Sequence, residues 1–311
     1  MNVTTDKTFT VNGTATLAGI VSLPPKAQRN PELPMVLFLN SGILHRIGAS
    51  RLHVKFSRIF AQLGYSSIRF DHSSLGDSGA RRGTATFEET ARAEVREIMD
   101  YAQKHHGAHS FMIFGLCSGA DIGHQVAVQD ERIVSLIEID PWTFTTTRSQ
   151  LRMLARHFGP RIFKASKWLA FFKRKLGLQQ TTSDDSPARD EWYADPEYVR
   201  HTPAKSEIAG EFQALMARNV CLYLCYSGCD YYGTYNYEGQ FQDAFPQVDF
   251  GDRVRVEWVQ DSTHLITALD HQQLLEQTIV EWLRETGQLP AADTTGAAQT
   301  TQPTAALARA G

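Results

Sequence analysis

The amino-acid sequence predicts an α/β fold, in which a mostly parallel sheet has helices on both faces and a helical cap is inserted. Three observations lead to this prediction. Strand-like runs alternate with helical patterns, runs such as 35–41 and 110–116 are apolar throughout, and the interval 141–219 contains no strand-like run. With 311 residues, of which 42% are hydrophobic, the chain can bury a large core.

Eight short runs rich in apolar and β-branched residues are expected to form strands. The runs lie at 9–13, 15–23, 35–41, 65–71, 110–116, 132–140, 220–228 and 254–260. The first two form a hairpin, and the later ones alternate with helices, so most of the sheet is parallel. Functional sites of such sheets lie at the carboxyl ends of the strands, so the residues directly after each strand are the candidates.

Four helices are expected between and after these strands. Apolar residues at helical spacing predict the first over 52–63. The second begins after Thr86, because Thr86 and Glu89 have the spacing of a capping box. The third follows directly on the fifth strand, and the last begins at Asp270, a residue type that often occupies the N-cap position.

Composition divides the chain into a core, a cap and a tail. Residues 1–140 and 220–287 carry the alternating pattern and are expected to form the core. The cap, 141–219, begins with a basic and aromatic part at 148–177 and continues with an acidic, turn-rich part. Residues 288–311 are low in bulky apolar side chains, so a disordered tail is expected there.

Charge and cysteine content argue against several classes of protein. A net charge of −3 argues against a nucleic-acid-binding protein, and no apolar run is long enough for a transmembrane segment. No apolar leader begins the chain, and Cys117, Cys221, Cys225 and Cys229 match neither a disulfide framework nor a metal-binding spacing. We therefore expect reduced thiols in a cytoplasmic protein. No nucleotide-binding glycine motif occurs, so no cofactor is expected. No carboxylate shares the spacing of His105, His106 and His109, so no metal is expected either.

The sequence GLCSG at 115–119 has the form of a nucleophile elbow, a sharp strand-to-helix turn with the nucleophile at its tip. Such a turn needs small residues two positions before and after the tip. Gly115 and Gly119 meet this need if Cys117 is the tip, whereas a tip at Ser118 would place Leu116 at a flank. The spacing selects Cys117. Taken alone, the motif also fits an inert buried thiol at a tight strand–helix junction.

Residues after later strands complete a catalytic triad with Cys117. Asp230 follows the seventh strand and His264 follows the eighth, in the chain order nucleophile, acid, histidine. Asp140, which ends the sixth strand, is the competing acid. Asp230 is preferred because Pro141 and the cap follow Asp140 directly.

Backbone N–H groups for an oxyanion hole are expected at two places. One is the N–H of Ser118, the residue after the nucleophile. The other lies in the loop after the third strand, where Gly42 lets the backbone approach closely and the N–H of Ile43 is the candidate donor. The pair His45 and Arg46 lines the pocket or holds the loop, and the sequence leaves both roles open.

The motifs NSGI, FDHSSLGDSG, GLCSG, GCD and STH, taken in this order, resemble the α/β-hydrolase superfamily over residues 8–285. The resemblance implies the α/β-hydrolase fold. The cysteine elbow is similar to that of dienelactone hydrolases, but their cap is much smaller, so their substrate is not implied. The NSGILHRIG loop and the elbow also resemble hydrolases encoded beside bacterial exopolysaccharide and exosortase systems.

The candidate residues predict acyl-group chemistry on a small-molecule ester, thioester or lactone. His264 would take the proton of Cys117, Asp230 would orient His264, and the acyl group would form a thioester with the cysteine. Thioesters react with amines as well as with water, so acyl transfer is an alternative to hydrolysis. A different class of function is a catalytically inactive ligand- or partner-binding protein with the same fold.

The basic and aromatic part of the cap has three interpretations. Its cations pair with the phosphates of a CoA- or carrier-bound acyl substrate, or they hold the helix weakly at a membrane surface. In the third interpretation they are solvated, and the apolar face of the cap covers the core. The third interpretation is preferred.

Overall fold

The computed structural model describes residues 4–162, 200–229 and 234–290. Strands and helices alternate along them. The strands are β1 (Thr5–Asn12), β2 (Thr16–Leu23), β3 (Met35–Phe38), β4 (Ser67–Phe70), β5 (Phe111–Leu116), β6 (Ile133–Ile139), β7 (Cys221–Cys229) and β8 (Val254–Thr263). The helices are α1 (Leu52–Gln62), α2 (Phe87–His106), α3 (Ser118–Gln129), α4 (Thr147–Ile162), α6 (Lys205–Ala217), α7 (Gln240–Ala244) and α8 (Leu269–Glu285).

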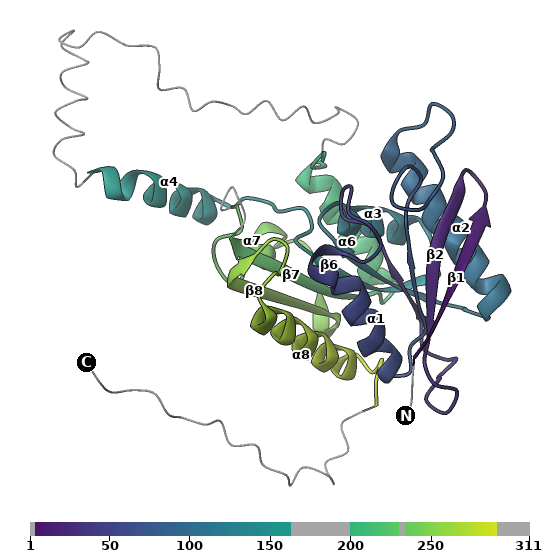
Figure 1. The fold of residues 1–311 in the computed structure, drawn as a ribbon. Coiled ribbons are helices and arrows are strands. Elements are labelled where there is room, and N and C mark those ends of the chain that lie inside the picture. The colour runs from purple at the N-terminus through teal and green to yellow at the C-terminus, as the bar shows by residue number, and fades with distance from the viewer. Residues whose placement is uncertain (1–3, 163–199, 230–233, 291–311) are drawn as a thin grey trace, which may run out of the picture.

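The strands form an eight-stranded sheet in the order β1-β2-β4-β3-β5-β6-β7-β8 (Figure 1). β2 pairs antiparallel with β1 and with β4, and the other neighbouring pairs are parallel. The predicted class, a mostly parallel sheet with an opening hairpin, is therefore confirmed. The strands of the five parallel pairs have their carboxyl ends at the same end of the sheet. The candidate residues that follow β3, β5, β6 and β8 therefore lie at that end.

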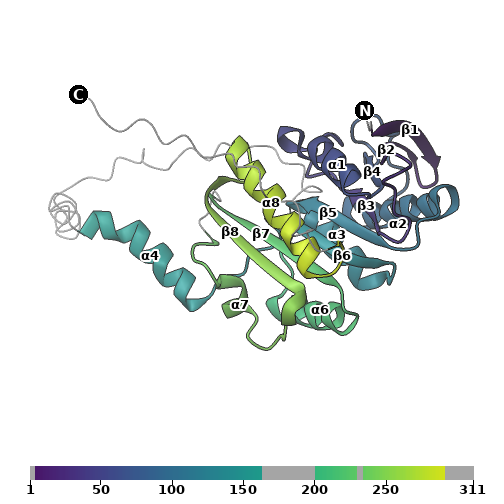
Figure 2. The ribbon, with the colours of Figure 1, turned by 90° about the horizontal axis from the view of Figure 1, so that it is seen from below.

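Alternate side chains of the central strands enter two apolar cores, one on each face of the sheet. In β5, Phe111 and Ile113 lie in the core with α2, α3 and α6, whereas Met112 and Phe114 lie in the core with α1 and α8. The two groups of helices cover opposite faces of the sheet (Figure 2). Because β5 is buried on both faces, its sequence is apolar without interruption.

Two helix starts test the capping signals of the sequence. At α2, Oγ1 of Thr86 accepts a hydrogen bond from the Glu89 N–H, and the Glu89 carboxylate accepts one from the Thr86 N–H, which confirms the capping box. At α8 the prediction is wrong, because the N-cap is Ala268 and Asp270 lies in the first turn. A carboxylate in the first turn also suits the positive end of the helix dipole, so the two positions look alike in sequence.

The predicted cap lies only partly within the described residues. α4 projects from the body of the molecule (Figure 1), whereas α6 packs on the sheet through Ile208, Phe212 and Leu215. α6 is thus part of the packed core, although the sequence groups it with the cap. The interval 163–199 lies outside the described residues. None of the described helices is long and apolar enough to cross a membrane.

The first residues of the predicted tail pack against the core. The Gln288 carbonyl accepts a hydrogen bond from the Tyr65 hydroxyl at 2.8 Å, and its side-chain oxygen accepts one from Ser135 at 2.6 Å. Leu289 is buried. Disorder therefore does not begin at residue 288 as predicted, and residues 291–311 lie outside the described residues.

Candidate active site

β5 and α3 meet in a sharp turn at Cys117. Its backbone has φ 55° and ψ −123°, a conformation that residues other than glycine rarely adopt. The Cys117 N–H donates to the Ile139 carbonyl at 2.8 Å, and the Cys117 carbonyl accepts from the N–H groups of Ala120 and Asp121. These bonds hold the strained residue at the amino-terminal end of α3, with its side chain partly buried.

Close packing around the turn requires the two flanking glycines. A Cβ atom at Gly115 would lie 2.4 Å from the backbone nitrogen of Ala120, and one at Gly119 would lie 2.6 Å from the Asn40 carbonyl oxygen. Both distances are too short for a real Cβ contact. The turn therefore has the geometry of a nucleophile elbow with Cys117 at its tip.

His264 follows β8 and lies beside a carboxylate. Its Nδ1 is 2.7 Å from Oδ2 of Asp140, the residue that follows β6. The Asp140 carboxylate also accepts hydrogen bonds from the N–H (2.6 Å) and the hydroxyl (2.7 Å) of Ser227 on β7. These bonds fix the carboxylate, which places a proton on Nδ1 of His264 and leaves Nε2 for a second partner.

The two aspartates that the sequence offered as the acid differ in what the structure describes. Asp140, the competing candidate, is the carboxylate that contacts His264. Asp230 lies outside the described residues, so its position relative to His264 is not described. Each directly follows a strand of the same sheet, and the preference for Asp230 rested only on Pro141 and the cap that follow Asp140.

The loop after β3 approaches the elbow. Gly42 has φ 51°, and its N–H donates a hydrogen bond to the Ser118 hydroxyl at 2.7 Å. The Ser118 side chain thus joins the elbow to the loop, a contact that the sequence did not predict. The next residue, Ile43, has a side chain that is 74% exposed. The structure therefore brings the three predicted oxyanion-hole residues together beside Cys117.

Solved structures with this architecture include esterases and other hydrolases. An esterase from Pyrococcus furiosus matches with a TM-score of 0.58 at 12% identity, over 91% of this chain and 91% of that chain. Est1E from Butyrivibrio proteoclasticus, solved with ferulic acid bound, gives 0.57 at 14% identity, over 89% and 98%. A serine hydrolase without a lid from Xanthomonas campestris gives 0.52 at 14% identity, over 92% and 96%. The chain has the α/β-hydrolase fold.

Two comparisons of the sequence with known proteins found no match. No protein-family model matches the chain, and no curated protein matches its sequence. The strand order and the elbow therefore carry the assignment of the fold. In this α/β-hydrolase fold, Cys117 follows β5, Asp140 follows β6 and His264 follows β8, so a thiol, a carboxylate and a histidine occur in this order along the chain.

The surroundings of Cys117 and His264 favour a charged pair. Burial raises the pKa of the Cys117 thiol, but the hydrogen bond to His264 and the positive charge of Arg200 outweigh burial, and the pKa falls below its usual value. The pKa of His264 rises to about 10, first because of the hydrogen bond to Asp140 and then because of that to Cys117. Both shifts favour the thiolate and the imidazolium relative to the neutral pair.

Arg200 is a candidate that the sequence did not indicate. Its Nη1 lies 3.7 Å from Sγ of Cys117, 83 positions away along the chain. Its Nε and Nη2 pair with the carboxylate of Asp121 at 2.5 and 2.8 Å. No local spacing links Arg200 to the elbow, so no sequence pattern could have singled it out.

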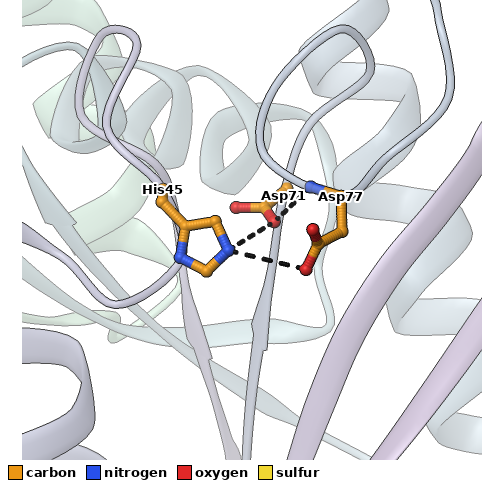
Figure 3. A group of neighbouring side chains, drawn as sticks. All are labelled: His45, Asp71 and Asp77. Carbon is orange, nitrogen blue, oxygen red and sulfur yellow. Dashed lines mark hydrogen bonds and ion pairs between the residues drawn. The ribbon is translucent and has the colours of Figure 1, made fainter.

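A second group of polar side chains holds the loop after β3 (Figure 3). Asp71, which follows β4, is fully buried, and its carboxylate accepts hydrogen bonds from Asn40 and from the backbone N–H groups of Arg46 and Asp77. It also pairs with the Arg46 guanidinium. His45 Nε2 lies 3.4 Å from Oδ2 of Asp71 and 3.7 Å from Oδ2 of Asp77. His45 and Arg46 thus hold the loop.

His45, Asp71 and Asp77 are also close enough to share a cation. The guanidinium of Arg46, however, pairs with both carboxylates and already supplies the positive charge there. A metal ion would have to displace this arginine. The donor set therefore favours a structural ion-pair cluster over a metal site.

Proposed function

We propose that the protein is an α/β-hydrolase that acts on an ester, thioester or lactone through a covalent acyl intermediate on Cys117. The observation that carries this proposal is the line of contacts from the thiol at the tip of the elbow, through His264, to Asp140. A nucleophile with a base beside it, and a third group that orients the base, is the arrangement that activates a thiol. Esterases and serine hydrolases with this fold support the same reaction class.

The proposed reaction has two halves. In the first, His264 holds the thiol proton while the Cys117 sulfur attacks the carbonyl carbon and the carbonyl oxygen becomes an oxyanion. When this intermediate collapses, the bond to the leaving group breaks and His264 protonates that group. In the second half, water gives a proton to His264 and attacks the thioester, which releases the acid and restores the thiol. An amine in place of water would give acyl transfer by the same steps.

We assign the role of the acid to Asp140. Its hydrogen bond to Nδ1 orients the imidazole and leaves Nε2 for the thiol, and its charge stabilises the imidazolium that forms when His264 takes the proton. Ser227 holds the carboxylate in place with two hydrogen bonds. Asp230 remains the alternative predicted from the sequence.

The oxyanion is proposed to bind to the Ser118 N–H, at the start of α3, and to an N–H of the loop at Gly42 or Ile43. The amino-terminal end of a helix favours negative charge, which supports the role of Ser118. The Gly42 N–H donates to the Ser118 hydroxyl, so a substrate oxygen that binds there would replace this hydroxyl as the acceptor.

The acyl donor is either a simple ester or lactone or a CoA- or carrier-bound thioester. Ile43 and Leu265, which adjoin the candidate residues Gly42 and His264, expose apolar side chains. These side chains favour an apolar acyl or leaving group. Weak membrane contact through the cap remains a separate hypothesis. Within α4, Arg148 stacks over the Tyr237 ring at 4.2 Å, so this cation already has a partner in the chain.

The test is turnover of a panel of p-nitrophenyl esters of increasing acyl length, aliphatic lactones and acyl-CoA thioesters. We expect hydrolysis by the wild-type protein and a loss of about 10³-fold or more in the variant Cys117→Ala. The matched control is Cys221→Ala, which removes a buried thiol on β7 and should leave turnover unchanged. Full activity of Cys117→Ala would contradict the proposal.

A further inference from the structure

Arg200 donates toward the candidate nucleophile from a fixed position. Two of its nitrogens, Nε and Nη2, face the two oxygens of the Asp121 carboxylate, and Nη2 also lies 3.1 Å from the Asp140 carbonyl oxygen. The remaining nitrogen, Nη1, is the one that lies 3.7 Å from Sγ of Cys117. The guanidinium is planar, so a two-point contact on one side fixes the direction of the third nitrogen.

Asp121 holds the guanidinium of Arg200 in this position. It lies in the first turn of α3, four positions after Cys117, and only 5% of its surface is exposed. A buried carboxylate without a partner is unfavourable and would also repel negative charge on the nearby sulfur. Arg200 neutralises Asp121 and at the same time presents a positive charge to Cys117.

We propose that Arg200 is a second electrostatic partner of Cys117, which stabilises the thiolate and so widens the pH range in which Cys117 is nucleophilic. This inference rests on the proposed function only in that it concerns the same cysteine. It assigns to Arg200 a contact with the reacting sulfur that is separate from the proton transfer by His264.

The charged groups that face Cys117 come from several elements. His264 approaches from the loop after β8, Arg200 lies just before α6, Asp121 belongs to α3, and Asp140 acts from the end of β6 through His264. The charge of Asp121 raises the pKa of the thiol, whereas those of Arg200 and His264 lower it. Loss of Arg200 would therefore remove a favourable charge and leave the unfavourable one of Asp121 without its counter-ion.

The geometry favours an action on the sulfur over capture of an anionic substrate. Asp121 and the Asp140 carbonyl occupy Nε and Nη2, so the guanidinium does not offer a second nitrogen for a two-point contact with a substrate carboxylate. The single nitrogen that remains is directed at Sγ. The two roles have different consequences for alkylation chemistry, which makes them separable.

The experiment measures the rate of alkylation of Cys117 by iodoacetamide over a pH series, with the modified peptide quantified by mass spectrometry. We expect Arg200→Gln to shift the midpoint of the profile upward by about one pH unit, which is about tenfold less thiolate below the midpoint. Arg200→Lys keeps the charge but loses the planar fork, so a smaller upward shift is expected. Circular dichroism and the Tm of each variant establish that it is folded.

The matched control is Arg96→Gln, which also removes one guanidinium. Arg96 donates to Gln129 at the far end of α3 from Cys117, so its loss should leave the midpoint unchanged. A folded Arg200→Gln variant with the wild-type midpoint would overturn the proposal. If Arg200→Gln does not fold, Arg200→Met, which keeps the aliphatic stem without the charge, takes its place, and a wild-type midpoint in that folded variant would overturn the proposal.

A second reagent separates the two roles of the arginine. Iodoacetate carries a carboxylate and iodoacetamide does not, so a substrate-binding arginine would accelerate iodoacetate selectively. We expect Arg200→Gln to slow both reagents by a similar factor. A loss confined to iodoacetate would overturn the proposal. Neither reagent requires turnover of an ester. A negative alkylation result would therefore not contradict the proposed acyl mechanism, and inactivity toward every ester would not contradict the alkylation result.

Discussion

Cys117 and Cys225 have opposite electrostatic surroundings within the same fold. Cys225 on β7 is buried, and burial together with the charges of Asp140 and Glu257 raises the pKa of its thiol far above the usual value. Cys117 is partly exposed and interacts with His264 and Arg200, which outweigh its burial. Of the two residues, Cys117 is thus the one suited to react as a thiolate.

The first prediction at the residue scale concerns selective alkylation. Iodoacetamide at neutral pH should modify Cys117 at least about 100-fold faster than Cys221 or Cys225, because the side chains of those two cysteines are buried. Peptide mass spectrometry of the folded protein measures the rates, and denatured protein, in which all thiols react alike, is the control. Equal slowness at all sites would contradict the prediction and favour the inactive binding protein.

The second prediction concerns the acid. Asp140→Asn should lower kcat by about 10⁴-fold, because the amide no longer holds the proton of His264 on Nδ1 or stabilises the imidazolium. Steady-state kinetics on the best ester of the panel measures the loss. Asp230→Asn is the comparison and should retain most of the activity. The reverse order of the two losses would assign the role of the acid to Asp230.

At this scale, local residue patterns were predictable and long-range contacts were not. Gly115 and Gly119 revealed the elbow because the turn leaves no room for a Cβ atom two positions before or after its tip. The choice between Asp140 and Asp230 depends on which carboxylate packs beside His264, and Arg200 meets Cys117 only through the tertiary fold. Residues that lie so far apart along the chain show no spacing by which a single sequence could reveal their contact.

At the scale of elements, the elbow depends on the close approach of α3 to the loop after β3. Gly119 faces the Asn40 carbonyl, and the Gly42 N–H donates to Ser118, so the helix and the loop touch at two points. The buried carboxylate of Asp71 also holds this loop, through the backbone N–H and the guanidinium of Arg46. Any change that separates α3 from this loop should therefore disturb the proposed oxyanion hole as well as the packing.

Two glycine substitutions test this dependence. Gly119→Ala should lower the free energy of unfolding by about 1–3 kcal/mol and abolish turnover, because the added methyl group would overlap the Asn40 carbonyl. Gly210→Ala is the control within α6, where a Cβ atom meets open space, and should raise the free energy of unfolding by about 0.5–1 kcal/mol. Urea unfolding measures both. A Gly119→Ala variant of wild-type stability and activity would contradict the proposed packing.

At the scale of the whole molecule, a buried cluster of charges joins α3, β6 and α6. Nδ1 of His124 lies 3.3 Å from Oε1 of Glu138, and its Nε2 lies 3.2 Å from Oε2 of Glu211. Burial lowers the pKa of His124, but the two carboxylates outweigh it and raise the pKa to about 9. The histidine is therefore charged in the folded protein at neutral pH.

This cluster predicts a pH dependence of stability. The folded-state pKa of His124 exceeds the value of 6.5 for the unfolded chain, so its stabilisation is complete below pH 6.5 and is lost as the pH rises through about 9. The resulting slope is at most about 1.4 kcal/mol per pH unit. Urea unfolding between these pH values should show this decline in the wild-type protein and a flatter profile in His124→Gln. Equal slopes in both proteins would contradict it.

The architecture was predictable from sequence to the extent that it depends on local apolar patterns. Strands buried on both faces, such as β5, reveal themselves by unbroken apolar runs. The placement of α6 was not predictable, because whether an amphipathic helix covers the sheet or belongs to an insertion is decided by packing. The ordered start of the tail likewise depends on partners far away, Tyr65 and Ser135.

Trapping of the acyl intermediate tests the role of Cys117 most directly. The protein would be mixed with an excess of its best ester, quenched in acid and measured by intact mass, and the modified peptide would then be identified. We expect a mass increase equal to the acyl group, located on Cys117 and absent from Cys117→Ala. An ester that is turned over while the adduct forms on another residue, or with equal efficiency by Cys117→Ala, would contradict a covalent cysteine mechanism.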